Sequence, residues 1–149
     1  MVTSSLIRRL RFEARHHYRR KDRDEAWNQG HYGDQLSPHS HTFRVEVRVE
    51  GEIDPETGFL ADLERLDQAM ETVFGPLRGA DLNVAIPEVA EGRMQPSTEA
   101  LALWALKGID HELGTEGPRV RAVFVFEDDE LGGGAERIHG GSDDARLHS

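Results

Sequence analysis

The stretch HSHTFRVEVRVE, residues 39–50, alternates between two kinds of side chain. Its odd positions carry two histidines, Phe43 and three valines, whereas its even positions are all polar or charged. Side chains two residues apart share one face of a strand, so the pattern predicts a half-buried strand from about His39 to Glu52. His39 and His41 then lie on its apolar face, roughly 6–7 Å apart.

A second alternating run, LIRRLRFEARH at residues 6–16, places His16 on the same face as Phe12 and Ala14. If the two strands pair, three imidazoles meet. Three neutral imidazoles can hold one zinc ion at about 2.0–2.1 Å and leave a fourth tetrahedral position open, as in catalytic zinc sites. We therefore predict a zinc site formed by His16, His39 and His41. The alternative is a chance pairing, because the chain has eight histidines.

Length and composition set the class of protein. A chain of 149 residues predicts one domain, assigned to residues 1–139, with the polar residues 140–149 as a flexible tail. The net charge of −10 argues against nucleic acid or an anionic membrane as the main partner. The sequence has no signal peptide pattern and no apolar run of about 18 residues, so we expect a cytoplasmic protein. The absence of cysteine excludes disulfides and thiol chemistry.

Eight of the 18 basic residues lie within the first 25 positions. We interpret them as a solvated strand face that leads into a polar loop, rather than as an anion site. That loop is expected from Arg19 to Pro38, because glycines and Pro38 interrupt it.

The second half of the chain predicts two amphipathic helices and two strands. The first helix spans about Leu60 to Phe74, and residues 75–95 are expected to be irregular. The second helix starts at Ser97 or Thr98 and stops at Gly114.

A strand from Val120 to Phe126 is apolar on both faces and is expected to be buried on both sides, with the Glu127 carboxylate at its end. Leu131–Gly134 reads as a turn before a last short strand, Ala135–His139. The order is β-β-α-α-β-β. It predicts an α+β fold in which two helices pack on one face of an antiparallel sheet.

Several motifs in this order resemble the 6-pyruvoyl-tetrahydropterin and 6-carboxy-tetrahydropterin synthase family, from about Leu10 to Glu127. They are Phe12-x-Ala14-x-His16, His39-Ser40-His41, residues 58–63 (GFLADL), Leu82-Asn83, residues 96–99 (PSTE) and Glu127. The resemblance implies the tunnelling fold, a zinc cofactor, and self-association as a trimer or hexamer with active sites at subunit interfaces.

The resemblance also implies a substrate site at Glu127, Thr98 and Glu99. A pterin presents a 2-amino group and a ring N–H side by side, and a carboxylate can accept both hydrogen bonds in parallel. Glu127, which ends an apolar strand, is therefore the candidate anchor for a heterocycle. The alternative for Glu127 is a strand end that faces solvent.

The chain differs from the family at the residues that transfer protons. The family uses a cysteine shortly before the His-x-His pair, and an Asp-His pair that aligns here with Arg78 and Gly79. Asp34, His31 and Tyr32, in the loop where the cysteine is missing, are candidate replacements as catalytic residues. The alternative is that they are ordinary polar loop residues. Asp110-His111 repeats the lost dipeptide, but it lies about 20 Å along the second helix from its start, so we expect it at the surface or an interface.

Three functions follow. The first is a zinc-dependent lyase or cyclase with altered chemistry, in which zinc polarises a carbonyl or hydroxyl of a pterin-like or other small substrate. The second is a non-catalytic zinc-containing protein for ligand binding or assembly. The third is a conventional tetrahydropterin synthase, which the missing residues disfavour.

Overall fold

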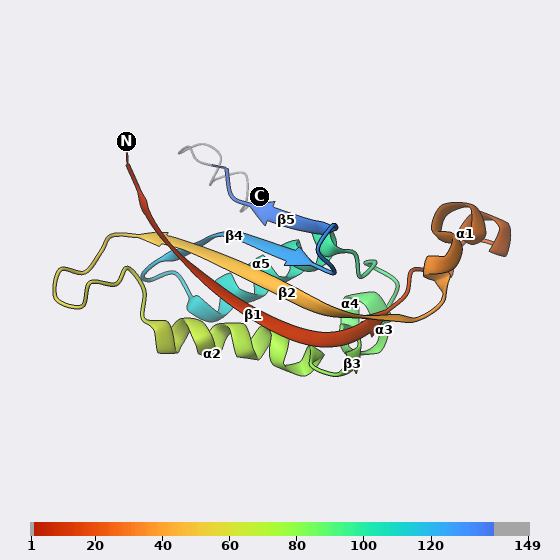
Figure 1. Ribbon diagram of the computed structural model, residues 1–149, viewed down its shortest axis with the longest axis horizontal. Coiled ribbons are helices and arrows are strands. Elements are labelled where there is room, and N and C mark those ends of the chain that lie inside the picture. The colour runs from red at the N-terminus through yellow and green to blue at the C-terminus, as the bar shows by residue number, and fades with distance from the viewer. Residues whose placement is uncertain (1, 139–149) are drawn as a thin grey trace.

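Two long helices pack on one face of a five-stranded sheet with the order β3-β1-β2-β4-β5 (Figure 1). The computed structural model describes residues 2–138. The strands are β1 (Ser4–His16), β2 (His39–Gly51), β3 (Ala80–Asp81), β4 (Arg119–Phe126) and β5 (Gly132–Glu136). The helices are α1 (Glu25–Tyr32), α2 (Leu63–Phe74), α3 (Leu82–Ala85), α4 (Pro87–Ala90) and α5 (Thr98–Leu113), with 3-10 turns η1 (Gly33–Leu36) and η2 (Gly75–Leu77). The predicted α+β class is confirmed.

The two alternating strands pair along their whole length, in antiparallel register. Phe12 lies opposite Phe43, with ring centroids 5.1 Å apart, and His16 lies opposite His39. The apolar face of both strands turns toward the helices, and Phe12 also contacts Phe74 of α2 at 5.7 Å. Because partners in an antiparallel pair share a face, this register carries the buried side of β1 directly onto that of β2.

Each long helix begins where a side chain can cap it. The carboxylate of Asp62 accepts from the backbone of α2, and the hydroxyl of Ser97 accepts from Ala100 at the start of α5. The observed α2 starts at Leu63, three residues later than expected from the apolar pattern. The two helices bury their apolar faces against the sheet. The fully buried large side chains of this core include Val45, Val47, Val49, Leu66, Phe74, Leu101 and Ile109.

The predicted double-sided burial of β4 is wrong. Val125 is buried toward the helices, but Phe124 and Phe126 point to the opposite face and are only half-buried. On that face the guanidinium groups of Arg48 and Arg44 lie 5.8 and 5.5 Å from the two ring centroids. None of the described helices covers this side of the sheet, and the arginine side chains cover the two rings instead.

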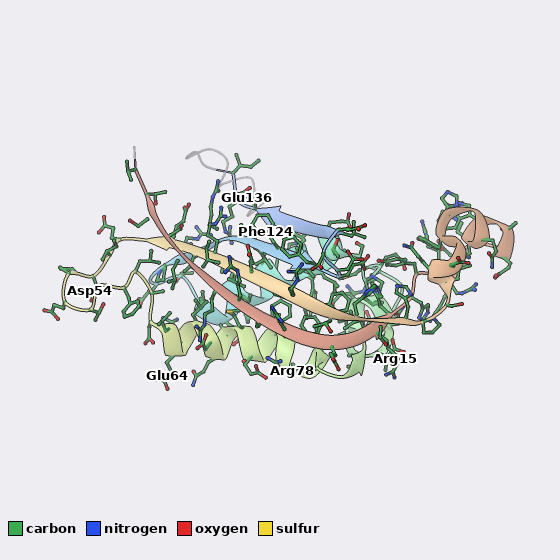
Figure 2. All side chains as sticks on the ribbon, in the orientation of Figure 1. Arg15, Asp54, Glu64, Arg78, Phe124 and Glu136 are labelled. Carbon is green, nitrogen blue, oxygen red and sulfur yellow. The ribbon has the colours of Figure 1, made fainter. Side chains whose placement is uncertain are left out.

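The predicted turn at Leu131–Gly134 is also wrong, because Gly132 to Gly134 belong to β5. A Cβ on Gly132 or Gly134 would collide with the ring of Phe126 or Phe124, respectively. Aromatic rings that lie across glycines compensate for the missing side chains and hold the strand in the sheet. Figure 2 shows Phe124 and Glu136, which come from these adjacent strands.

The expected long loop between β1 and β2 contains α1 and η1. Asp24 caps α1 by accepting from the backbone N–H of Trp27 at 2.8 Å. The helix was not predicted because it has few apolar residues, although Asp24 is a typical residue for a helix start. This segment projects from one end of the sheet (Figure 1). Two of its four lysine and arginine residues form local ion pairs, Arg19 with Glu25 and Arg20 with Asp22. The pairs agree with a solvated surface rather than an anion site.

Residues 75–95, expected to be irregular, contain short helices and β3. Strand β3 pairs in parallel with Ala14 and Arg15, so the sheet is not wholly antiparallel. None of the described helices is long and apolar enough to cross a membrane. The expected tail, 140–149, and the end of the predicted last strand at His139 lie outside the described residues.

Candidate metal and ligand site

Three histidines converge where β1 ends and β2 begins. Each of His16, His39 and His41 offers a nitrogen, and these three atoms lie within 4.8 Å of one another. The register explains this convergence, because His16 is directly opposite His39, and His41 is opposite Ala14 one step along the same face. The alternating pattern and the strand pairing together create the group.

Two of these imidazoles have a fixed tautomer. Nδ1 of His16 is 2.8 Å from the carbonyl oxygen of Pro96, and Nδ1 of His39 is 2.9 Å from that of Ser37. A carbonyl can only accept, so each Nδ1 carries the proton and each Nε2 keeps its lone pair. Such hydrogen bonds orient the imidazoles of metal sites and make them better ligands.

Three buried polar atoms in and beside this group form no hydrogen bond. Nε2 of His16, Nε2 of His41 and Oε2 of Glu127 are buried and lack a hydrogen bond. The Glu127 oxygen lies 3.4 Å from the His16 nitrogen and 3.5 Å from the His41 nitrogen. Buried polar atoms are normally satisfied, so three of them around one point fit a bound cation.

His16 is inaccessible to solvent, and this burial lowers its pKa to about 4. The hydrogen bond to Pro96 opposes the shift, while neighbouring His39 and His41 add to it. The imidazole is therefore neutral at neutral pH, the form that binds a metal ion.

The predicted substrate-binding residues lie on two elements. Glu127 directly follows β4 and is 7% exposed, which places its carboxylate beside the histidines instead of in solvent. Thr98 is buried in the first turn of α5, next to the exposed Glu99. Gly133 packs against this turn, so β5 holds the helix start in place.

The three candidate replacements for the cysteine occupy different environments. His31 is exposed, stacks on Trp27 at 3.9 Å and directs Nδ1 to the Trp27 carbonyl. Asp34 is exposed at the start of η1. Tyr32 packs on Tyr18, which packs on His16, whereas His31 reaches this chain of ring contacts only through Trp27.

Sequence reasoning missed Tyr18. Its ring centroid is 5.1 Å from that of His16 and 6.4 Å from that of His39. The signal was present, because Tyr18 continues the two-residue step that runs through Ala14 and His16.

The motif residue Asn83 organises the chain after His16. Its side-chain oxygen accepts from the backbone N–H of His17 at 3.0 Å, and its amide donates to the His17 carbonyl at 2.9 Å. The Asn83 side chain thus satisfies both backbone groups of His17, as a neighbouring strand would.

Arg78 and Gly79, which align with the lost Asp-His pair, bind the edge of β1. Nη1 of Arg78 donates to the Arg11 carbonyl at 2.8 Å, and the Gly79 amide donates to the Glu13 carbonyl at 2.6 Å. Gly79 has φ +68°, which disfavours a side chain there. Figure 2 labels Arg78 beneath the middle of β1. Arg78 and Gly79 therefore satisfy backbone carbonyls at the edge of β1.

Asp110 and His111 lie on the surface side of α5, as expected from their spacing. The Asp110 carboxylate accepts from Arg137 at 2.6 Å, and His111 is exposed. This pair takes no part in the histidine group.

These features define an α+β protein with three convergent imidazoles and an adjacent carboxylate at one end of its sheet. The family model for 6-pyruvoyl tetrahydropterin synthase matches residues 5–139. The chain therefore belongs to the 6-pyruvoyl tetrahydropterin synthase family, as the motifs predicted.

The relatives of this chain are named for two different enzyme activities. The chain is 32% identical to 6-pyruvoyl tetrahydrobiopterin synthase of Homo sapiens over 104 residues, which cover 68% of this chain and 72% of the human protein. It is 31% identical to dihydroneopterin monophosphate aldolase of Pyrococcus furiosus over 94 residues, 63% of this chain and 74% of the aldolase. The structure of Caenorhabditis elegans 6-pyruvoyl tetrahydropterin synthase matches with a TM-score of 0.83 at 19% identity, covering 91% of this chain and 96% of that one.

Proposed function

We propose that this protein is a zinc-dependent lyase or cyclase that acts on a small pterin-like molecule by chemistry altered from that of conventional tetrahydropterin synthases. The observation that carries the proposal is the set of unpartnered buried atoms, two imidazole nitrogens and a Glu127 oxygen, around one point. His16, His39 and His41 would hold the ion. Bound there, zinc would supply Lewis acidity toward a carbonyl or hydroxyl oxygen of the ligand.

Glu127 is the proposed anchor for the heterocycle. Its carboxylate is buried beside the metal ligands, where two parallel hydrogen bonds from an amino group and a ring N–H would be strong and directional. Thr98 and Glu99, at the start of α5, would border the same ligand. The anchor and the metal site would thus be immediate neighbours, because the Glu127 oxygen lies 3.4 Å from Nε2 of His16 and 3.5 Å from Nε2 of His41.

The altered chemistry rests on what replaces the proton-transfer residues. The sequence has no cysteine, and Arg78 and Gly79 are hydrogen bonded to the β1 edge. Proton transfer is therefore assigned to Asp34, His31 or Tyr32. The human and archaeal relatives, a synthase and an aldolase by name, support the idea that one scaffold serves more than one pterin reaction.

We further propose that the chain assembles as a trimer or hexamer. On the outer edge of β1, only Ala14 and Arg15 pair with a described strand, and no helix of residues 2–138 covers the sheet face opposite α2 and α5 (Figure 1). Open edges invite strand pairing between copies. Such an assembly would bring the exposed Asp34 and His31 of one copy near another.

Metal analysis of the purified protein tests the central claim. We expect about one zinc per chain, lost in His39→Ala and kept in the surface variant His111→Ala. A metal-free wild type that is unchanged by His39→Ala would overturn the zinc proposal.

Turnover assays test the altered chemistry. Dihydroneopterin triphosphate should bind without conversion at the rate of a conventional synthase. Conversion at that rate would show that the lost cysteine and Asp-His pair are dispensable, and would restore the conventional function.

A further inference from the structure

Two arginines lie directly opposite each other on the sheet face that no described helix covers (Figure 1). Arg11 of β1 is the register partner of Arg44 of β2, and Arg44 is the partner of Phe126 of β4. The three side chains therefore form one row across the sheet. Like charges directly opposite each other destabilise a pair of strands, and a bound anion would relieve this repulsion.

The neighbouring row has the opposite arrangement of charge. There Arg9 is the register partner of Glu46, and its Nε lies 2.7 Å from a carboxylate oxygen of Glu46. Among the described residues, no carboxylate forms an ion pair with Arg11, including Glu13 two residues further along the same face, and no group accepts a hydrogen bond from its guanidinium. The solvated strand face expected from the sequence thus includes an arginine whose charge the described chain leaves unpaired.

These rows border a groove of about 550 Å³. Its lining includes the three arginines of the two rows, Arg9, Arg11 and Arg44, and the ring of Phe126. The carboxylate that lines it, Glu46, is the partner of Arg9. In a chain with a net charge of −10, a groove with more arginines than carboxylates favours an anionic ligand.

Arg44 is held in position without a ligand. Its Nη2 donates to the Asp128 carbonyl at 3.2 Å, and its guanidinium carbon lies 5.5 Å from the ring centroid of Phe126. The Asp128 carboxylate accepts from two backbone N–H groups of the turn that follows, both at 2.8 Å. The carboxylate of Asp129, 3.4 Å from Arg44, is 96% exposed and is a weak competitor for a ligand. A guanidinium fixed in this way loses little freedom on binding.

We propose that this groove binds the phosphate group of a small molecule, which Arg11 and Arg44 hold together. Guanidinium groups present pairs of N–H donors that match phosphate oxygens. Arg11 is an odd-numbered residue of β1, whereas His16 lies on the even-numbered face that packs on the helices. The phosphate site is therefore on the opposite side of the sheet from the histidine group and goes beyond the proposed function.

The test titrates the full-length protein with inorganic phosphate at fixed ionic strength and measures Kd by isothermal titration calorimetry. Arg11→Gln and Arg44→Gln should each weaken binding about tenfold or more, the effect of a lost charge-assisted hydrogen bond. Arg15→Gln is the matched control, because it removes the same charge from the same face of β1 outside the groove. It should change Kd by less than about twofold, since Arg15 is four residues from Arg11, more than a Debye length at 0.1 M salt.

Thermal unfolding separates loss of binding from loss of structure. Without phosphate, Arg11→Gln should unfold at the wild-type midpoint or above it, because the like-charge contact with Arg44 is gone. With phosphate, the wild-type midpoint should rise, and that of Arg11→Gln should stay where it was.

Three results would overturn the inference. They are a wild type that does not bind phosphate, an unchanged Kd in Arg11→Gln, and an equal weakening in Arg15→Gln, which would indicate general attraction to a basic face. His39→Ala tests independence from the histidine group. Binding retained in His39→Ala would support the groove whether or not the wild type holds zinc. Binding lost in His39→Ala but kept in Arg11→Gln would place the phosphate at the histidines instead.

Discussion

The carbonyl oxygen of Pro96 accepts a 2.8 Å hydrogen bond from Nδ1 of His16. Pro96 immediately precedes Ser97, the cap of α5, so the start of this helix also orients an imidazole of β1. The bond fixes the tautomer and leaves Nε2 of His16 for a metal ion. The histidine group and the proposed substrate residues at the start of α5 therefore depend on one local structure.

Metal removal should destabilise the protein. The buried Nε2 atoms of His16 and His41 lack partners without an ion, and a ligand at a hundredfold excess over its Kd stabilises the native state by about 2.7 kcal/mol. Chelation should thus lower the midpoint of thermal unfolding by roughly 5–10 °C, and added zinc should restore it. His16→Ala should abolish the zinc response, whereas exposed His111→Ala should retain it. Equal midpoints with and without zinc in the wild type would contradict this prediction.

Gly133→Ala should be strongly destabilising. A Cβ at this position would lie 2.5 Å from the backbone nitrogen of Glu99 and 2.8 Å from the hydroxyl of Thr98. The helix backbone cannot move away cheaply, so we expect a loss of about 2–3 kcal/mol in the free energy of unfolding, measured with urea. Gly30→Ala in α1 is the matched control.

Because nothing lies within 4 Å of a Cβ at Gly30, that substitution should be neutral or stabilising by up to about 1 kcal/mol. Equal losses in the two variants would show that the packing between β5 and the start of α5 is not the cause. Neopterin binding should also weaken in Gly133→Ala alone, since Thr98 and Glu99 would shift.

The sequence predicts the convergence of His16, His39 and His41 because its determinants are local. The two-residue period that buries Phe12 and Phe43 also aligns His16 with His39, once the strands pair. Likewise, apolar side chains spaced by three and four residues are sufficient to predict α2. In each case one repeat along the chain determines which side chains face inward.

The missed elements depend on contacts between distant residues. Gly132 to Gly134 form a strand only because Phe124 and Phe126 cover them, and no local signal in LGGG distinguishes that from a turn. Helix α1 buries only Asn28, so it has no apolar period to detect. Tyr18 was overlooked because its alternation with His16 continues beyond the end of the strand.

Arg78→Gln should cost more stability than its exposure suggests. The guanidinium donates to the Arg11 carbonyl on the unpaired edge of β1 and also contacts Glu71. We expect a loss of about 0.5–1.5 kcal/mol in urea unfolding, typical of a hydrogen bond. Arg93→Gln, which removes a pair with Glu91 at the surface, should change stability by less than about 0.5 kcal/mol. No difference between the variants would reject the edge-capping role.

Asn28→Ala should loosen the segment that carries the candidate proton-transfer residues. Asn28 is fully buried, and its amide donates to the carbonyls of Arg20, Arg23 and Asp24, while its oxygen accepts from the Arg20 N–H at 2.8 Å. Alanine removes the partner of the Arg20 N–H and of the Arg23 carbonyl, whereas the Arg20 and Asp24 carbonyls keep backbone bonds from Arg23 and residue 28. Each unsatisfied group costs about 1–3 kcal/mol when it stays buried, so the segment should instead open to water.

Hydrogen exchange measures this opening. Because α1 projects from the end of the sheet (Figure 1), exchange should accelerate across α1 and η1 and stay unchanged in β2 and α5. Gln29→Ala, next in sequence but exposed, should leave the exchange pattern as in the wild type. If His31, Tyr32 or Asp34 moves the proton, turnover in Asn28→Ala should fall while zinc content stays constant. Full turnover with rapid exchange in α1 would instead place proton transfer outside this segment.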